Sequence, residues 1–200
     1  MEEIKRKILK NKFGRVILEW DRRIEQNAYR YNFEEFTLSS GLPGVILLLL
    51  EMEDLDRTYK SKIDQYCDYL YGKLSKYGLL TGSLYSGAAG IALSLLPLKK
   101  DLRFQNLIAS LNDYISYYVD KEIGEFNIGN VTPPNYDVIE GLSGILMYLL
   151  LIDNIDIKLV TKIIIFLLTL LDDNDSLIAM YIKTGNQMSE AENEIYPNGC

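Results

Sequence analysis

The chain has 200 residues, of which 48% are apolar and 11% aromatic, so it can bury one sizeable hydrophobic core. Its net charge of −7, without any basic block, argues against a surface that binds nucleic acid. The sequence contains no histidine, which removes the usual general base at neutral pH and the commonest neutral metal ligand.

Apolar residues recur at helical spacing along nearly the whole chain and period-2 runs are scarce, which predicts an all-α fold. The first ten residues mix both charge signs and lack the apolar core of a secretory signal. The longest apolar stretches, 141–152 and 163–171, are shorter than the roughly 20 residues of a membrane span. We therefore expect a cytoplasmic protein without a transmembrane segment. The expected helices, in chain order, are 2–25, 43–53, 58–76, 88–97, 103–119, 142–152 and 157–171.

Three of these helices begin with the same pattern, Gly-x-x-Gly followed by apolar residues, and the copies are far enough apart for one helix pair each. Glycines three residues apart share one face of a helix and leave a strip on which a neighbouring backbone can come close. Glycine costs about 1 kcal/mol relative to alanine in a helix, so three such pairs indicate a packing requirement at each helix start. The six glycines are Gly41, Gly44, Gly87, Gly90, Gly141 and Gly144.

The glycine-headed helices alternate with helices that carry interspersed charges, at 58–76, 103–119 and 157–171. A helix that is apolar nearly all round is buried, whereas a helix with a polar face is peripheral. The alternation predicts an α/α toroid, a double ring of inner and outer helices, of which about three pairs form an incomplete arc. Residues 121–136 are expected to be a long irregular connection. An open arc would leave apolar surface exposed, which predicts association.

The segments SGLPGVILLLLEM, TGSLYSGAAGIALSLL and YDVIEGLSGILMYLL resemble, in this order, the lanthionine synthetase C-like family, whose members are helical toroids with glycine-headed inner helices. The resemblance covers about residues 35–200 and implies the N-terminal half of a cyclase. That enzyme adds a peptide cysteine to dehydroalanine or dehydrobutyrine and closes a thioether ring, as in lantibiotic biosynthesis. We expect one partial domain over residues 1–200, with a lead-in (1–35), three repeats (36–171) and a polar tail (172–200).

In this family, two cysteines and one histidine hold a zinc ion that binds the incoming thiol. The resemblance implies that these ligands and a catalytic histidine would follow Cys200, so we expect no metal site in this chain and no activity by the chain alone. Cys67 is interpreted as a packed thiol, and Cys200 lacks the zinc-ligand context. The expected partners are a dehydrated precursor peptide and either a dehydratase or a second chain that carries the missing half.

One residue of the family's active centre matches this sequence, namely the aspartate before the third glycine-headed helix, which corresponds to Asp137. A carboxylate at a helix N-terminus is favoured in its ionised form. Asp137 could instead simply cap the helix beginning near Ile139, a role that aspartate fills well. A non-enzymatic helical module that binds a peptide or a partner protein also fits this fold. A toroidal carbohydrate enzyme would need paired carboxylates across a cavity, and Asp137 and Glu140 are only three residues apart.

Overall fold

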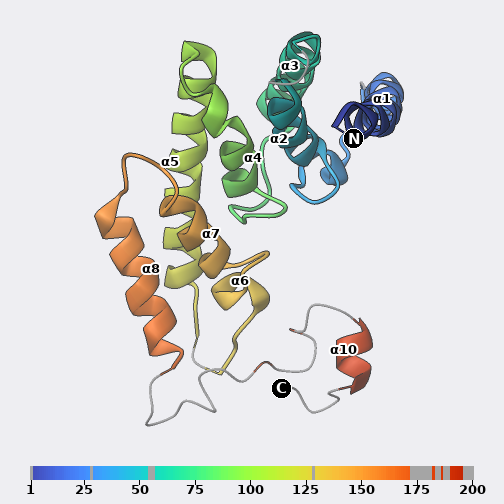
Figure 1. Cartoon of the computed structure of the whole chain (residues 1–200). Helices are drawn as coiled ribbons and strands as arrows, with labels where there is room; N and C mark the ends of the chain where they lie inside the picture. The colour runs from blue at the N-terminus through green and yellow to red at the C-terminus, as the bar shows by residue number, and fades with distance from the viewer. Residues whose placement is uncertain are drawn as a thin grey trace. The chain divides into compact units, whose positions relative to one another are not determined.

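The computed structural model describes residues 2–27, 29–53, 57–127, 129–171, 182, 186 and 190–195. Every regular element in these ranges is helical, as the periodicity predicts, and none is long and apolar enough to cross a membrane (Figure 1). The chain divides into two compact units, Met1–Asn32 and Phe33–Cys200. In the first unit the described helix is α1 (Glu2–Asn27), on which an ion pair one turn apart joins Arg23 to Glu19.

Helix pairs make up most of the second unit, and each pair joins one glycine-headed helix to one amphipathic helix (Figure 1). The glycine-headed, or inner, helices are α2 (Leu42–Glu53), α4 (Ala88–Leu95) and α7 (Leu142–Leu149). Their outer partners are α3 (Tyr59–Tyr77), α5 (Leu102–Gly124) and α8 (Ile157–Thr169). The other described helical segments of the unit are short: η1 (Phe33–Phe36), η2 (Leu96–Leu98), α6 (Pro133–Tyr136) and α10 (Glu190–Ile195).

The seven helices expected from the sequence are present, but the interpretation of residues 121–136 as irregular was wrong at both ends. α5 continues to Gly124, because the residues before that glycine include no helix breaker. At the other end, α6 has proline at its first position and a capping box formed by Thr132 and Asn135. Local capping chemistry therefore makes a short helix in a stretch that the prolines mark as a loop.

The inner helices form the core of the second unit. Each packs along its outer partner, and they also pack on one another, α2 on α4 and α4 on α7. α4 is enclosed by its neighbours, so that Ala88, Ile91 and Leu95 have no exposed surface. The outer helices α3 and α5 bury one apolar stripe and expose mostly charged and polar residues on the other side. The burial pattern thus follows the predicted alternation of inner and outer helices.

Charged side chains link each outer helix to the next. Arg103 on α5 lies 2.5 Å from Asp68 and 3.3 Å from Asp64, both on α3. Lys162 on α8 lies 2.6 Å from Asp120 on α5. These side chains are largely exposed, so each pair contributes at most about 1 kcal/mol, and apolar packing of the inner helices is the main stabilising contact between the pairs.

Candidate functional site

A three-residue turn precedes each inner helix, and the residue before the turn accepts a backbone hydrogen bond with its side-chain oxygen. The turns are 38–40, 84–86 and 138–140. The donors, the acceptors and the distances between them are Ser40 to Thr37 at 3.2 Å, Ser86 to Ser83 at 3.2 Å, and Glu140 to Asp137 at 2.9 Å. Asp137 therefore has in the third repeat the position that Thr37 and Ser83 have in the first and second.

The glycines allow each turn to fold back onto the start of its own helix. A Cβ atom on the second glycine of any pair would lie closer than 3.0 Å to the carbonyl oxygen of the residue six positions earlier. A Cβ atom on the first glycine would meet other backbone atoms of the same turn region equally closely. The approaching backbone is thus the preceding turn, and any side chain at the six glycines would displace it.

Asp137 is fixed through both its side chain and its backbone. Its Oδ1 accepts hydrogen bonds from the backbone N–H groups of Ile139, at 3.0 Å, and Glu140, at 2.9 Å. Its carbonyl oxygen accepts from the N–H groups of Gly141, at 3.0 Å, and Gly144, at 3.4 Å. The glycine pair therefore holds the residue whose carboxylate is the candidate catalytic group.

The Asp137 side chain caps the turn formed by residues 138–140 and does not cap helix α7. α7 begins at Leu142, after the N-cap residue Gly141, and not near Ile139. Within the described part of the chain, both hydrogen bonds to the Asp137 carboxylate go to Oδ1. Oδ2 is accordingly the oxygen that can meet a ligand, on a side chain whose orientation is already set.

Glu140 fastens the turn that carries Asp137 to the turn of the second repeat. Its Oε2 accepts a hydrogen bond from Ser83 Oγ at 2.7 Å and another short one from Ser86 Oγ. Both serines are buried, and their hydroxyl oxygens lie 2.9 Å apart. Two hydroxyl donors compensate the carboxylate for water lost on packing. These three side chains, the Glu140 cluster, tie the third repeat to the second.

Main-chain hydrogen bonds also link each turn to the turn of the next repeat. The Leu38 N–H donates to the carbonyl oxygen of Tyr85 at 2.5 Å, and the Tyr85 N–H donates to that of Ile139 at 3.1 Å. These bonds join the three turns in sequence order. Asp137 thus immediately precedes the last turn of the described series.

The residues of this chain do not fit the zinc site that the resemblance suggests. The sequence has no histidine and two cysteines, and the described residues contain no group of three or more His, Cys, Asp or Glu able to hold a metal. Cys67 is buried on α3, and burial raises the pKa of its thiol to about 12. Such a thiol stays protonated at neutral pH, whereas zinc binds the thiolate. Cys200 lies outside the described residues.

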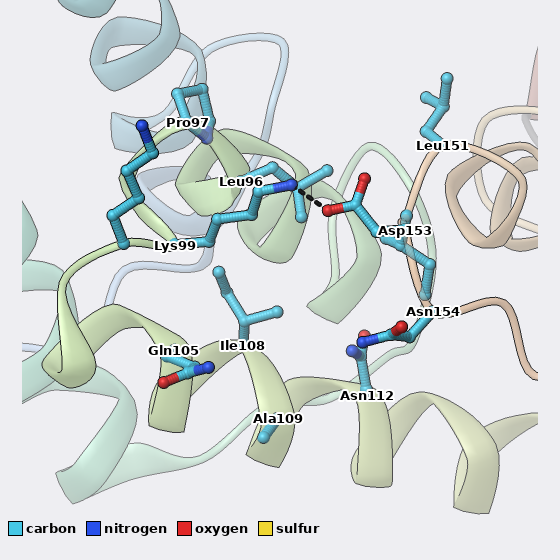
Figure 2. Close-up of a pocket in the computed structure, with 12 residues that line it drawn as sticks. Leu96, Pro97, Lys99, Gln105, Ile108, Ala109, Asn112, Leu151, Asp153 and Asn154 are labelled. Atoms are coloured by element: carbon cyan, nitrogen blue, oxygen red, sulfur yellow. Dashed lines mark hydrogen bonds and ion pairs between the residues drawn. The ribbon is translucent and has the colours of Figure 1, made fainter.

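A hollow of about 700 Å³ lies at the far ends of α4 and α7 from the turns (Figure 2). Its lining includes Leu96 of η2, Asn112 of α5 and the segment that follows α7. An ion pair between Lys99 and Asp153 joins two of its sides, as Figure 2 shows. α7 has 8 residues and is about 12 Å long, so the hollow does not adjoin the Asp137 carboxylate.

Ser83 was not singled out from the sequence, and Glu140 was weighed only as a carboxylate paired with Asp137, although the three copies carry a signal for the roles of both residues. Superposing the copies on their glycines places an oxygen-bearing side chain before the turn and another at its end. The first position holds Thr37, Ser83 and Asp137, and the second holds Ser40, Ser86 and Glu140. This alignment predicts the turn, but the bonds between repeats depend on how the repeats stack.

Comparison with known proteins agrees with the observed fold. A family model described as lanthionine synthetase C-like protein matches residues 32–200. Nisin biosynthesis protein NisC from Lactococcus lactis subsp. lactis is 53% identical over 201 residues, which covers 98% of this chain and 48% of that protein. The structure of a nisin cyclase matches with a TM-score of 0.89 and 52% identity, over 97% of this chain and 48% of that one. The chain spans about half the length of these relatives, and the match confirms the expected toroid-type arrangement of helix pairs.

Proposed function

The chain belongs to the lanthionine synthetase C-like family, and from this premise we propose that it supplies the Asp137-bearing part of a cyclase that closes thioether rings in a precursor peptide. In this reaction a cysteine thiolate of the peptide attacks the β-carbon of a dehydrated serine or threonine. A C–S bond forms, the double bond becomes an enolate, and the α-carbon then takes up a proton. The chemistry requires a thiol activated for attack and a group that moves a proton.

The fixed carboxylate of Asp137 is the observation that carries this proposal. Two backbone N–H groups occupy Oδ1, so the side chain is held in one orientation while Oδ2 can exchange a proton with a ligand. A positioned carboxylate can accept the thiol proton or return a proton to the α-carbon. Thr37 and Ser83 hold their turns in the same way, but a hydroxyl does not titrate near neutral pH. Asp137 combines the turn cap with acid–base chemistry.

When zinc is bound in a cyclase of this family, it supplies a lowered thiol pKa and a fixed nucleophile. The ligand set of this chain does not fit that ion, so we infer that the metal ligands come from polypeptide outside these 200 residues. By this account the chain alone does not cyclise. Its substrate is a precursor peptide that a dehydratase has already treated. We propose that the chain acts on this peptide in the cytoplasm. Residues 1–200 form one partial domain in this proposal.

A second candidate function is a non-enzymatic module that binds a peptide or a partner protein with the same helices. The absence of a zinc-ligand group from the described residues favours it. The two candidates differ in one measurable respect: a binding module would hold the dehydrated precursor without any dependence of ring closure on Asp137.

A chimaera of nisin cyclase tests the proposal, with this chain replacing the segment that it matches. We expect the chimaera to close rings in dehydrated precursor peptide, followed as the loss of alkylatable thiols by mass spectrometry. Asp137→Asn keeps an oxygen acceptor for the turn but removes the group that moves the proton. It should therefore slow ring closure by about 100-fold or more.

Asp156→Asn is the matched control, because Asp156 Oδ1 also accepts two backbone N–H groups, from Lys158 and Leu159, at the start of α8. Asparagine and aspartate cap almost equally well, so this variant should keep full activity. If the Asp137→Asn chimaera folds and closes rings as fast as the Asp156→Asn chimaera, Asp137 has no catalytic role.

A further inference from the structure

Both backbone groups that hold the Asp137 carboxylate belong to residues anchored on the second repeat. Ile139 and Glu140 donate their N–H groups to Oδ1 of Asp137, at 3.0 Å and 2.9 Å. The carbonyl oxygen of Ile139 accepts the N–H group of Tyr85 at 3.1 Å. The carboxylate of Glu140 accepts the two serine hydroxyls of the Glu140 cluster. The direction from which the two N–H groups approach Asp137 is therefore set by the second repeat.

The serines give Glu140 a fixed anchor. Ser83 has no exposed surface and Ser86 is 6% exposed, and the N–H group of Ser86 donates to Ser83 Oγ at 3.2 Å. Hydrogen bonds to a carboxylate are roughly twice as strong as neutral ones. The anchored side chain and the N–H donor of Glu140 belong to the same residue, so holding the carboxylate also holds the N–H group that points at Asp137.

The backbone of Asp137 is supported separately from its side chain. Its carbonyl oxygen accepts the N–H group of Gly144 at 3.4 Å, at the start of α7. Leu84 of the second repeat is 8% exposed, and its Cβ atom lies 3.0 Å from the place that a Cβ on Gly144 would take. This packing does not involve the Glu140 side chain. Removing that side chain should therefore loosen the Asp137 carboxylate and leave the turn in place.

The first repeat has no such anchor at the equivalent position. Ser40 ends the first turn as Glu140 ends the third, but Ser40 is exposed. Its hydroxyl oxygen lies 2.9 Å from that of Thr37, which is the residue before its own turn. The longer acidic side chain of Glu140 reaches a neighbouring repeat instead. This side chain occurs in the repeat whose turn is preceded by a carboxylate and not by a hydroxyl.

We infer that Glu140 is a positioning residue for ring closure: anchored on Ser83 and Ser86, it orients the Asp137 carboxylate towards the reacting atoms. This rests on the proposed function, in which Asp137 moves the proton. The two serine donors bond to Oε2 of Glu140, so Glu140 acts through Asp137 and not as a second acid or base. Orientation of this kind matters because a misplacement of about 1 Å can slow a reaction by roughly 100-fold.

Kinetics of the nisin cyclase chimaera test the inference. Glu140→Ala should lower kcat by about tenfold, because Ile139 still donates to Asp137, and should leave KM for the dehydrated precursor unchanged. Glu140→Gln keeps an oxygen that accepts the serine hydroxyls and should retain about half of kcat or more. Ser40→Ala is the matched control at the equivalent turn position and should keep full kcat. Rates are compared per folded molecule, so that lost stability is not counted as lost catalysis.

A double variant shows whether Glu140 acts through Asp137. If it does, the chimaera with both Asp137→Asn and Glu140→Ala should close rings as slowly as the chimaera with Asp137→Asn alone. Rate losses that multiply would mean that Glu140 acts by another route, and they would overturn the inference.

Amide hydrogen exchange in the chain itself reports the orientation without reference to activity. Glu140→Ala should speed exchange at residues 139 and 140 by about tenfold or more. The amides of Lys158 and Leu159, which donate to Asp156 in the same way, should not change.

The two readouts separate this inference from the proposed function. If Asp137→Asn is slow and Glu140→Ala keeps full kcat, the inference is overturned and the proposed function stands. If Asp137→Asn closes rings as fast as Asp156→Asn, the proposed function fails. Unchanged exchange at residues 139 and 140 would then overturn the orienting role of Glu140 as well, whereas faster exchange would support it.

Discussion

The second and third repeats share one backbone design but differ in charge and in what covers them. In both, an oxygen-bearing side chain holds the turn before a Gly-x-x-Gly helix start. The second repeat uses the buried hydroxyls of Ser83 and Ser86, and its Leu84 is covered by the next repeat. The third repeat has the carboxylates of Asp137 and Glu140 at these positions, and its Val138 is exposed.

This difference has a physical reason. A hydroxyl can be enclosed between repeats at small cost, whereas an ionised carboxylate needs water or several donors. Glu140 has the two serines as donors, and Asp137 has two backbone N–H groups for one oxygen. The last turn of the described series can therefore carry acid–base groups at positions that are neutral in the second repeat.

The largest expected effect comes from adding a side chain at the second glycine of the second repeat, against which the turn of that repeat folds back. In Gly90→Ala the new Cβ would overlap the carbonyl oxygen of Leu84, which cannot move without displacing the turn. We expect a loss of about 3 kcal/mol in the free energy of unfolding, measured by denaturant titration. Gly72→Ala is the control: it lies on α3 with no atom near the new Cβ and should gain up to about 1 kcal/mol. Equal effects would show that the turn does not fold back as described.

The dependence of stability on alkaline pH compares the packing of the second and third repeats, because each contains a buried tyrosine. Burial raises the pKa of Tyr118 on α5 to about 12, and it also raises the pKa of Tyr148 on α7, whose hydroxyl donates to Asn112 at 2.7 Å. The unfolded chain loses these protons near pH 10, so stability is complete below that pH and falls as the pH rises towards the folded pKa values. The slope should reach about 1.4 kcal/mol per pH unit for each tyrosine.

Tyr148→Phe removes one of these groups and should make the decline less steep by that amount. Denaturant titrations at a series of alkaline pH values measure the slope. If the variant declines as steeply as the unmodified chain, Tyr148 is accessible, and the third repeat is less firmly packed than the second.

Serine-to-alanine substitutions at equivalent turn positions should give a smaller difference in the free energy of unfolding. Ser86 is buried and donates to Glu140, whereas Ser40 in the first repeat is exposed. Ser86→Ala should cost about 1 to 2 kcal/mol because a carboxylate loses a donor, and Ser40→Ala should stay within about 0.5 kcal/mol. Thermal and denaturant unfolding measure both. Equal costs would mean that the Glu140 cluster does not join the repeats.

The smallest effect is expected for the ion pair between the outer helices of these repeats. Lys162→Ala removes the partner of Asp120 and should lower stability by at most about 1 kcal/mol, less at high salt. A salt titration of the unfolding free energy distinguishes this from lost packing. A loss well above that value, insensitive to salt, would contradict the view that apolar contacts between inner helices dominate.

The order and type of the helices could be predicted because burial leaves a 3.6-residue period in the sequence. The glycine pairs also predicted a close backbone contact, but not that the approaching backbone is the turn of the same repeat. Leu84 and Val138 are both apolar, so no pattern distinguishes the covered residue from the exposed one. The helix that begins at Ile157 was predicted to be peripheral because charges are interspersed in it, and this pattern does not predict that a second apolar side of the helix is exposed.

The candidate site was predictable in part. Asp137 could be named from the sequence, with catalysis and capping as alternative roles. The structure shows that the carboxylate caps the turn through one oxygen, an arrangement that leaves room for both roles. The partners of Glu140 lie 54 and 57 residues away in the sequence, and such contacts leave no periodic trace.

The most direct test of the central claim is the rate at which free thiols disappear from dehydrated precursor peptide in the presence of the nisin cyclase chimaera. The account predicts ring closure that is retained in Asp156→Asn and reduced by about 100-fold or more in Asp137→Asn, with both variants equally folded. Equal rates for the two variants would contradict it.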